Sequence, residues 1–143
     1  MYCPFCSHED TRVLESRIVN SAVRRRRECE KCSSRFTTYE KALFQLSVIK
    51  KDGHTQLFAL EKIAMSIEKA LGKPDQELVN TLTKKVEQRI LAKKKNPIKT
   101  TEIGRMVLAE LKKQDKMAYV RFATIHKSID DPKVLEKELE MMI

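Results

Sequence analysis

Glycine and proline are scarce in this sequence, with three glycines and four prolines among 143 residues. Flexible linkers and low-complexity segments are usually rich in these residues, so we expect no long disordered stretch. No apolar run is long enough to span a bilayer. Cys3 stands so near the start that it leaves no room for a charged and apolar leader, and we therefore expect a cytoplasmic protein.

Two common nucleotide-binding signatures, G-x-x-x-x-G-K-[ST] and G-x-G-x-x-G, are absent. Any nucleotide must therefore be held by something other than a P-loop or a Rossmann turn. Signs of catalysis are equally scarce, because the three histidines, His8, His54 and His126, lie far apart and no carboxylate pair is marked out by its surroundings. We do not expect an enzyme.

Positive charge is abundant, with 29 Lys and Arg residues against 20 Asp and Glu residues and a net charge of +9. Such a balance favours a polyanionic partner, nucleic acid before an acidic membrane surface. Four consecutive arginines, Arg24 to Arg27, would point to both faces of a strand, and guanidinium groups suit phosphate oxygens or the edge of guanine. The alternative is a solvated basic edge that protects the strand from aggregation. We take as DNA-contact candidates Arg17, Arg24, Arg25, Arg26, Arg27 and Arg35.

Four cysteines form two close pairs, Cys3-x-x-Cys6 and Cys29-x-x-Cys32. Each pair places two thiolates on one tight turn, and two such turns together give the sulfur tetrahedron that Zn²⁺ prefers. The pairs are 22 residues apart, slightly more than is usual for this motif. The alternative is two disulfides, which are typical of small secreted proteins. We favour a zinc ribbon that holds one Zn²⁺ per chain.

Alternating β-branched and polar residues between the cysteine pairs predict a hairpin of residues 12–19 and 23–27, which turns at Asn20-Ser21. A third strand, residues 35–40, should close the ribbon. Residues 1–40 contain too few large apolar side chains for a core, so metal binding must supply the missing stability, on the order of 10 kcal/mol or more.

A second unit should begin with two short strands, residues 46–51 and 54–58, joined at Asp52-Gly53 by a tight turn with positive φ at both positions. Helical spacing then follows, and Thr100 or Thr101 should cap the third helix. The expected inward positions are Ile63, Ile67, Ala70, Leu71, Leu78, Leu82, Val86, Ile90, Ile103, Val107, Leu111, Ala118, Phe122, Ile125, Leu135, Leu139 and Met142. The fold class is therefore α+β, with a ribbon domain at residues 1–45 and a mainly helical domain at residues 46–143.

Lysines cluster at the start of the second unit. Lys50 and Lys51 lie at a strand end, and Lys62 lies in the first turn of the following helix. These cations and the helix N-terminus could converge on a triphosphate. The alternative is that the lysines only solvate the surface.

The motifs Cys3-Pro4-x-Cys6, Glu15-Ser16-Arg17, Arg24 to Arg27, Cys29-x-x-Cys32 and Arg35-Phe36-Thr37-Thr38-x-Glu40 resemble the zinc ribbon of the bacterial NrdR family, repressors of ribonucleotide reductase genes. Further along, Val48-Ile49-Lys50-Lys51-Asp52-Gly53, Leu60-Glu61-Lys62-Ile63 and Tyr119-Val120-Arg121-Phe122-Ala123 resemble the ATP-cone domain of that family. The resemblance covers nearly the whole chain.

The resemblance implies a homo-oligomeric regulator that binds paired operator boxes in double-stranded DNA through its ribbon. Its cone would sense ATP and dATP, which change oligomerisation and hence DNA affinity. The implied zinc ligands are Cys3, Cys6, Cys29 and Cys32, and the nucleotide-contact candidates are Val48, Lys50, Lys51, Lys62 and His126.

The sequence departs from the family pattern within the cone. Lys51 replaces an arginine, Ala59 replaces an aspartate that would cap the first helix, His126 replaces a tyrosine, and Ile129 replaces an aromatic residue. Two other functions remain open at this point: a detached regulatory cone that acts on a reductase by protein contact, and an RNA-binding ribbon with a purely structural helical domain.

Overall fold

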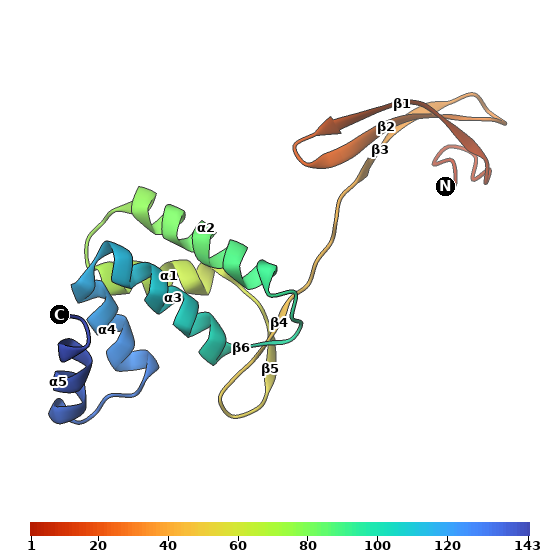
Figure 1. The fold of residues 1–143 in the computed structure, drawn as a ribbon. Coiled ribbons are helices and arrows are strands. Elements are labelled where there is room, and N and C mark those ends of the chain that lie inside the picture. The colour runs from red at the N-terminus through yellow and green to blue at the C-terminus, as the bar shows by residue number, and fades with distance from the viewer. The chain divides into compact units, whose positions relative to one another are not determined.

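Three antiparallel strands form the first part of the chain in the computed structural model, which describes all 143 residues (Figure 1). They are β1 (Thr11–Val19), β2 (Ala22–Cys29) and β3 (Arg35–Glu40), in the order β1-β2-β3. Val19 pairs with Ala22, and Asn20 and Ser21 have φ values of 47° and 62°. Positive φ at both central residues defines the primed hairpin turn, so the predicted ribbon and its turn at Asn20-Ser21 are confirmed.

The chain divides into two units, Met1–Phe44 and Gln45–Ile143. In the first unit the buried residues are Cys3, Ala22, Glu28 and Cys29, whereas every member of the buried apolar cluster lies at Leu46 or beyond. The ribbon therefore has no apolar core of its own. Its stability must come from the strand ladder and from whatever the cysteines bind.

A small mixed sheet opens the second unit, with β5 (Thr55–Leu57), β4 (Ser47–Ile49) and β6 (Ile98–Lys99) in that order. The strands β4 and β5 are antiparallel, and β4 and β6 are parallel. This brings residues 48 and 98 side by side, although 49 residues separate them in the sequence. The pairing with β6 was not predicted.

The predicted tight turn at Asp52-Gly53 is wrong. Ile49 pairs with Thr55, so a five-residue loop joins the strands, and only Gly53 in it has positive φ, at 93°. The Gly53 amide donates to the Lys50 carbonyl at 3.0 Å, and the Lys50 amide donates to the His54 carbonyl at 2.9 Å. Asp52 instead accepts a hydrogen bond from the His54 amide, which suits a wider turn with glycine in the left-handed position.

Five helices follow: α1 (Leu60–Leu71), α2 (Gln76–Ala92), α3 (Thr100–Gln114), α4 (Lys116–His126) and α5 (Pro132–Glu140). Gly72 ends α1 in the left-handed conformation, and Asp75, Asp115 and Asp131 cap α2, α4 and α5 through their carboxylates. The predicted cap at Thr100 or Thr101 is wrong, because the chain enters α3 directly from β6 and Lys99 takes the cap position. None of these helices has the length and apolar character needed to cross a membrane.

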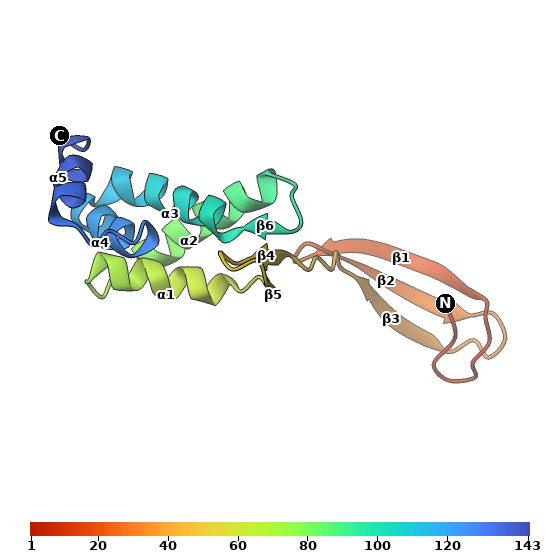
Figure 2. The ribbon, with the colours of Figure 1, turned by 90° about the horizontal axis from the view of Figure 1, so that it is seen from below.

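The apolar core lies among α1, α2, α3 and α4. In Figures 1 and 2 the sheet lies at one end of this unit and α5 at the other. Buried positions that the helical spacing predicted are Ile63, Ile67, Ala70, Leu71, Leu82, Val86, Ile90, Ile103, Val107, Leu111 and Ala118. Leu78, Phe122, Leu135 and Met142 are half-buried.

Two predicted core positions are wrong. Ile125 is 82% exposed, because α4 turns Ala118, Tyr119 and Ala123 inwards instead. Leu139 is 38% exposed, because the neighbouring Glu138 faces inwards, where it binds the Tyr119 hydroxyl and the Lys127 ammonium. A polar contact thus orients α5.

Candidate functional site

The four cysteine side chains meet at one point of the ribbon. Their Sγ atoms all lie within 4.8 Å of one another, with Cys3 and Cys29 buried and Cys6 and Cys32 exposed. The Cys3 and Cys32 sulfurs are 3.7 Å apart, and the Cys6 and Cys29 sulfurs are 3.6 Å apart. A tetrahedron with Zn–S bonds of about 2.3 Å has edges of about 3.8 Å, so the donor set fits one Zn²⁺.

The two cysteine turns have the same local geometry. Ser7 and Ser33 have φ values of 60° and 58°, and their amides donate to the carbonyls of Cys3 and Cys29 at 2.9 and 3.0 Å. Backbone amides also approach the sulfurs, with Phe5 N at 3.4 Å from Cys3 Sγ and Lys31 N at 3.4 Å from Cys29 Sγ. Amide donors favour thiolate over thiol, which is the form that binds metal.

The disulfide alternative does not agree with this geometry. All four cysteines are free, and the sulfur separations far exceed the bonded distance of about 2.05 Å. Hydrogen bonds from Ser34 lower the pKa of the Cys32 thiol to about 6. Burial and the neighbouring cysteines, in contrast, raise the pKa of Cys6 to about 12 in the absence of a metal, because the four sulfurs crowd together. The cluster therefore has the composition and spacing of a four-thiolate metal site.

The register of the ribbon sorts its arginines onto two faces. Arg24 pairs with Arg17 and Tyr39, and Arg26 pairs with Glu15 and Thr37. Because side chains alternate along a strand, these residues share one face, with Arg12, Glu28 and Arg35 further along it. We call this the Arg24 face, defined by Arg12, Glu15, Arg17, Arg24, Arg26, Glu28, Arg35, Thr37 and Tyr39. Arg25 and Arg27 lie on the opposite face.

Most of these arginines already have partners. On the Arg24 face, Arg12 and Arg35 both bind Glu28, at 2.5 and 2.9 Å, and these hydrogen bonds lower the pKa of the Glu28 carboxyl. Arg17 pairs with Glu15.

On the opposite face, Arg25 binds Glu40 at 2.6 Å, and Arg27 donates to Thr38 at 3.2 Å and to Thr11 at 3.4 Å. The guanidinium groups of Arg24 and Arg26 make no hydrogen bond or ion pair with the protein. Of the six arginine candidates, these two are free to bind a phosphate.

The second unit has a cavity of about 100 Å³ beside its sheet. It brings together the predicted residues Val48, Lys50 and Lys62. Residues that the sequence reasoning missed complete its wall: Gln56, Leu57, Phe58, Ala59, Ile63, Thr100 and Ile103. The N-termini of α1 and α3 both border it, since Ala59 precedes α1 and Thr100 begins α3. Ala59 provides no side-chain cap, so the cap residue of α1 does not compete with a bound anion, and the one acid in the first turn is Glu61.

Lys51 and His126 do not line this cavity. They line an adjoining one of about 470 Å³, together with Lys50, Asp52, His54 and Thr100. Lys50 and Thr100 border both spaces, and Lys51 Nζ donates to the His126 carbonyl at 3.1 Å. The nucleotide candidates are thus distributed over two neighbouring cavities that share Lys50 and Thr100, which together we call the sheet-end cleft.

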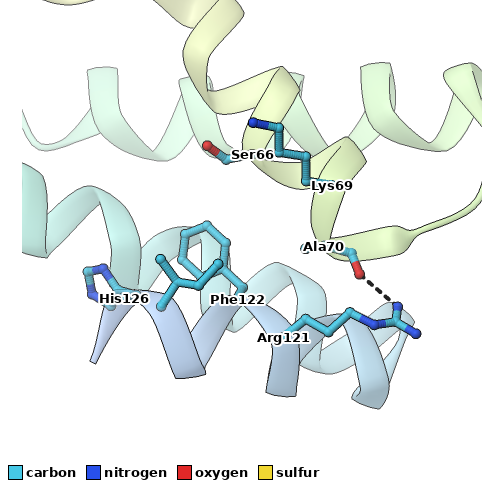
Figure 3. A pocket seen from close by; sticks show the side chains of 7 residues that line it. Ser66, Lys69, Ala70, Arg121, Phe122 and His126 are labelled. Atoms are coloured by element: carbon cyan, nitrogen blue, oxygen red, sulfur yellow. Dashed lines mark hydrogen bonds between the residues drawn. The ribbon is translucent and has the colours of Figure 1, made fainter. Parts of the chain in front are cut away.

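A further cavity of about 380 Å³ lies between α1 and α4 (Figure 3). Arg121 forms part of its wall and fastens the two helices, because its Nη1 donates to the carbonyls of Ala70 at 2.9 Å and Leu71 at 3.2 Å. The aromatic rings of Phe122 and His126 line the same space. His126 therefore borders both this cavity and the sheet-end cleft.

A ribbon with four clustered cysteines, followed by a helical unit with a lysine-lined cleft, is the domain order of a zinc-ribbon and ATP-cone protein. Two family models match the chain in that order. The model described as "Transcriptional repressor NrdR-like, N-terminal domain" matches residues 1–40, and the ATP cone domain matches residues 46–132. The chain belongs to the NrdR family of transcriptional repressors. It is therefore not an enzyme, as the sequence indicated.

Curated relatives are similar over nearly the full length. The transcriptional repressor NrdR of Corynebacterium glutamicum strain R is 39% identical over 146 residues, which cover 99% of this chain and 96% of the relative. The transcriptional repressor NrdR of Methylibium petroleiphilum is 44% identical over 135 residues, which cover 91% of this chain and 92% of the relative. That of Dechloromonas aromatica is 43% identical over 136 residues, or 92% and 88% of the two chains.

Proposed function

We propose that this protein represses ribonucleotide reductase genes by binding paired operator boxes in double-stranded DNA. The ribbon, residues 1–45, holds the DNA, and the cone, residues 46–143, binds ATP or dATP. The nucleotide controls the order of the homo-oligomer and hence the affinity for DNA. The observation that carries the proposal is the pair of unengaged guanidinium groups, Arg24 and Arg26, on one face of the ribbon.

Zinc has a structural role in this proposal. Cys3, Cys6, Cys29 and Cys32 hold it, and when bound it links the two cysteine turns and stabilises the fold. Cys29 is the last residue of β2, the strand that carries all four consecutive arginines. Metal binding therefore fixes the strand whose guanidinium groups face the duplex.

Arg24 and Arg26 are the principal DNA contacts. They lie two residues apart on one face, so their Cα atoms are about 6.6 Å apart along the strand, and both guanidinium groups are presented on the same side of the ribbon. Arg17 and Arg35 flank them with charges that are partly neutralised by Glu15 and Glu28. Arg25 and Arg27 lie opposite and brace the sheet through Glu40, Thr38 and Thr11.

The sheet-end cleft holds the nucleotide. Its cations are Lys50, Lys51 and Lys62, and the N-terminal amides of α1 and α3 add partial positive charge. Apolar side chains of Val48, Phe58 and Ile103 line the smaller part and suit a base or sugar, while the lysines suit the phosphates. Paired operator boxes require a symmetric assembly, so the oligomer is the functional unit. Repression places the protein in the cytoplasm with the DNA.

A mobility shift on DNA from upstream of the organism's reductase genes tests the proposal, with zinc-loaded full-length protein and with ATP, dATP or neither. We expect a specific complex whose affinity changes between nucleotides. With four phosphate contacts from two ribbons, the slope of log K against log salt concentration should be about −3.6. Binding to a scrambled duplex with the same affinity, or no response to either nucleotide, would contradict the proposal.

A further inference from the structure

The ring of His126 is held in a fixed position between two cavities. It borders the sheet-end cleft and also the cavity between α1 and α4. Its ring stacks on Phe122, with centroids 5.7 Å apart and planes inclined by 26° (Figure 3). A Cβ atom at Gly104 would lie 1.9 Å from His126 Cε1, so only glycine at this position of α3 leaves room for the ring.

The charged groups around His126 are mostly cations. Burial disfavours the charged form of the imidazole most. Three cations add to this effect, namely Lys51 in the loop after β4, Lys127 at the end of α4 and Arg105 on α3. The pKa of His126 therefore lies below its usual value of 6.5. Lys50 lines the cleft as well, and Lys69 and Arg121 line the other cavity. The one acid among the lining residues is Asp52, and it pairs with His54.

A polyanion in the cleft would reverse this balance. Its phosphates would neutralise Lys50 and Lys51 and offer acceptors to an imidazolium N–H, which is a stronger donor than a neutral imidazole. We propose that His126 is a proton-dependent phosphate contact, so that binding of a nucleoside polyphosphate in the sheet-end cleft is coupled to the uptake of a proton by its imidazole. This inference rests on the proposed function, because it assigns a proton to the same nucleotide site.

The direction of the pH dependence follows from linkage. At a pH above the pKa that His126 has in the complex, its imidazole is neutral with or without ligand and does not contribute to the pH dependence of nucleotide affinity. As the pH falls through that value, the bound form gains a proton that the free form lacks, and affinity rises. Below the lower pKa of the free form both states are protonated and the gain is complete. Each pKa unit by which the bound and free values of His126 differ contributes about a tenfold change in nucleotide affinity.

Isothermal titration calorimetry of the zinc-loaded full chain with ATP measures the coupling directly. Titrations near pH 7 in two buffers of different ionisation enthalpy give the number of protons taken up. The ATP phosphates also titrate, with a pKa of about 6, but they do so in every variant. His126→Gln should therefore take up fewer protons than the wild type and lose most of its affinity gain, about tenfold, between pH 8 and pH 6.

The matched control is His8→Gln, which removes a histidine of the ribbon outside the cleft and should leave the uptake unchanged. The competing variant is His54→Gln, which removes the other histidine of the cleft. If His126→Gln binds ATP with the same proton uptake as the wild type, the inference is wrong and the proposed function stands. If the uptake disappears with His54 instead, the inference is also wrong. Absence of ATP binding in the wild type would overturn both.

A second measurement leaves His126 intact and so does not depend on the folding of its variant. The Cε1 protons of the three histidines can be followed by NMR against pH, with assignments from His8→Gln and His54→Gln. We expect the His126 resonance to titrate below pH 6.5 in the free protein and at higher pH with saturating ATP. An unchanged or lower pKa in the complex would overturn the inference.

Discussion

Arg25 donates a hydrogen bond of 2.6 Å to the carboxylate of Glu40 across the ribbon sheet, on the face opposite to Arg24 and Arg26. Four arginines in a row therefore do not share one role. Arg25 and Arg27 brace the sheet through hydrogen bonds, whereas Arg24 and Arg26 have no partner in the protein. This division gives the arginine run a testable internal control.

The double variant Arg24→Ala and Arg26→Ala should weaken operator binding by tenfold or more. Since each ribbon loses two phosphate contacts, the slope of log K against log salt concentration should become shallower by about 2 for each ribbon bound. The matched variant Arg25→Ala should change the slope much less, since its guanidinium already has a carboxylate partner. Fluorescence anisotropy at several salt concentrations measures both effects. ATP affinity should stay constant in each variant, and equal losses from Arg25→Ala would show that both faces contact DNA.

Removal of the metal should unfold the ribbon and leave the cone intact. The ribbon buries two cysteines, one alanine and one glutamate, whereas the cone has its own apolar core. Chelation of the metal, or Cys6→Ser, should therefore abolish operator binding and the β-strand contribution to the circular dichroism spectrum. The helical contribution and ATP binding should persist. Restoring Zn²⁺ to the chelated protein should restore DNA binding. Operator affinity that survives complete loss of zinc would contradict the assignment.

The ribbon could be predicted almost completely from the sequence. Its turn residues, Asn20 and Ser21, take up the left-handed conformations that a two-residue hairpin requires, and the two Cys-x-x-Cys pairs fix the metal site. These signals are local, because each needs only a few neighbouring residues. The partners of the individual arginines could not be predicted from such local signals. They depend on the register between β2 and β3, which brings Glu40 and Thr38 beside the arginines.

The cleft was harder to predict because its walls come from distant segments. The strand β6 has only two residues, and its parallel partner β4 lies about 50 positions earlier. The side chain of Asn96 reinforces this contact, since it accepts from Ser47 N and donates to the Gln45 carbonyl, both at 2.9 Å. Thr100 and Ile103 reach the cleft only through this pairing, so no local pattern identifies them.

Lys62→Ala should weaken binding of ATP and dATP severalfold to tenfold without loss of zinc. Lys62 lies in the first turn of α1 and lines the smaller part of the cleft, so its ammonium is placed to meet a phosphate. Lys85→Ala, an exposed lysine on α2 outside the cleft, is the control for loss of one positive charge. Calorimetric titration measures the affinities. Full nucleotide affinity in the Lys62 variant would count against the cleft.

Glu138 should stabilise the cone in a pH-dependent manner. Hydrogen bonds from Lys127 and Tyr119 lower the pKa of Glu138 below its ordinary value of 4.5, and the hydrogen bond to Glu138 raises that of Lys127 above 10.5. The carboxylate therefore contributes fully above pH 4.5 and loses its effect as the pH falls through its lower folded-state value. The lysine contributes fully below pH 10.5, so the pair stabilises most between these limits.

Glu138→Gln should accordingly lower the free energy of unfolding by about 1 to 2 kcal/mol at pH 7, since the Lys127 side chain is 40% exposed and solvent screens the pair. The difference from the wild type should shrink as the pH falls below 4.5, because protonation then removes the same charge from the native residue. Urea unfolding followed by helical circular dichroism at pH 7 and pH 3.5 measures it. Glu136→Gln, an exposed position on the same helix, should have little effect. A loss that is equally large at both pH values would mean that packing, rather than the charge on Glu138, holds α5 in place.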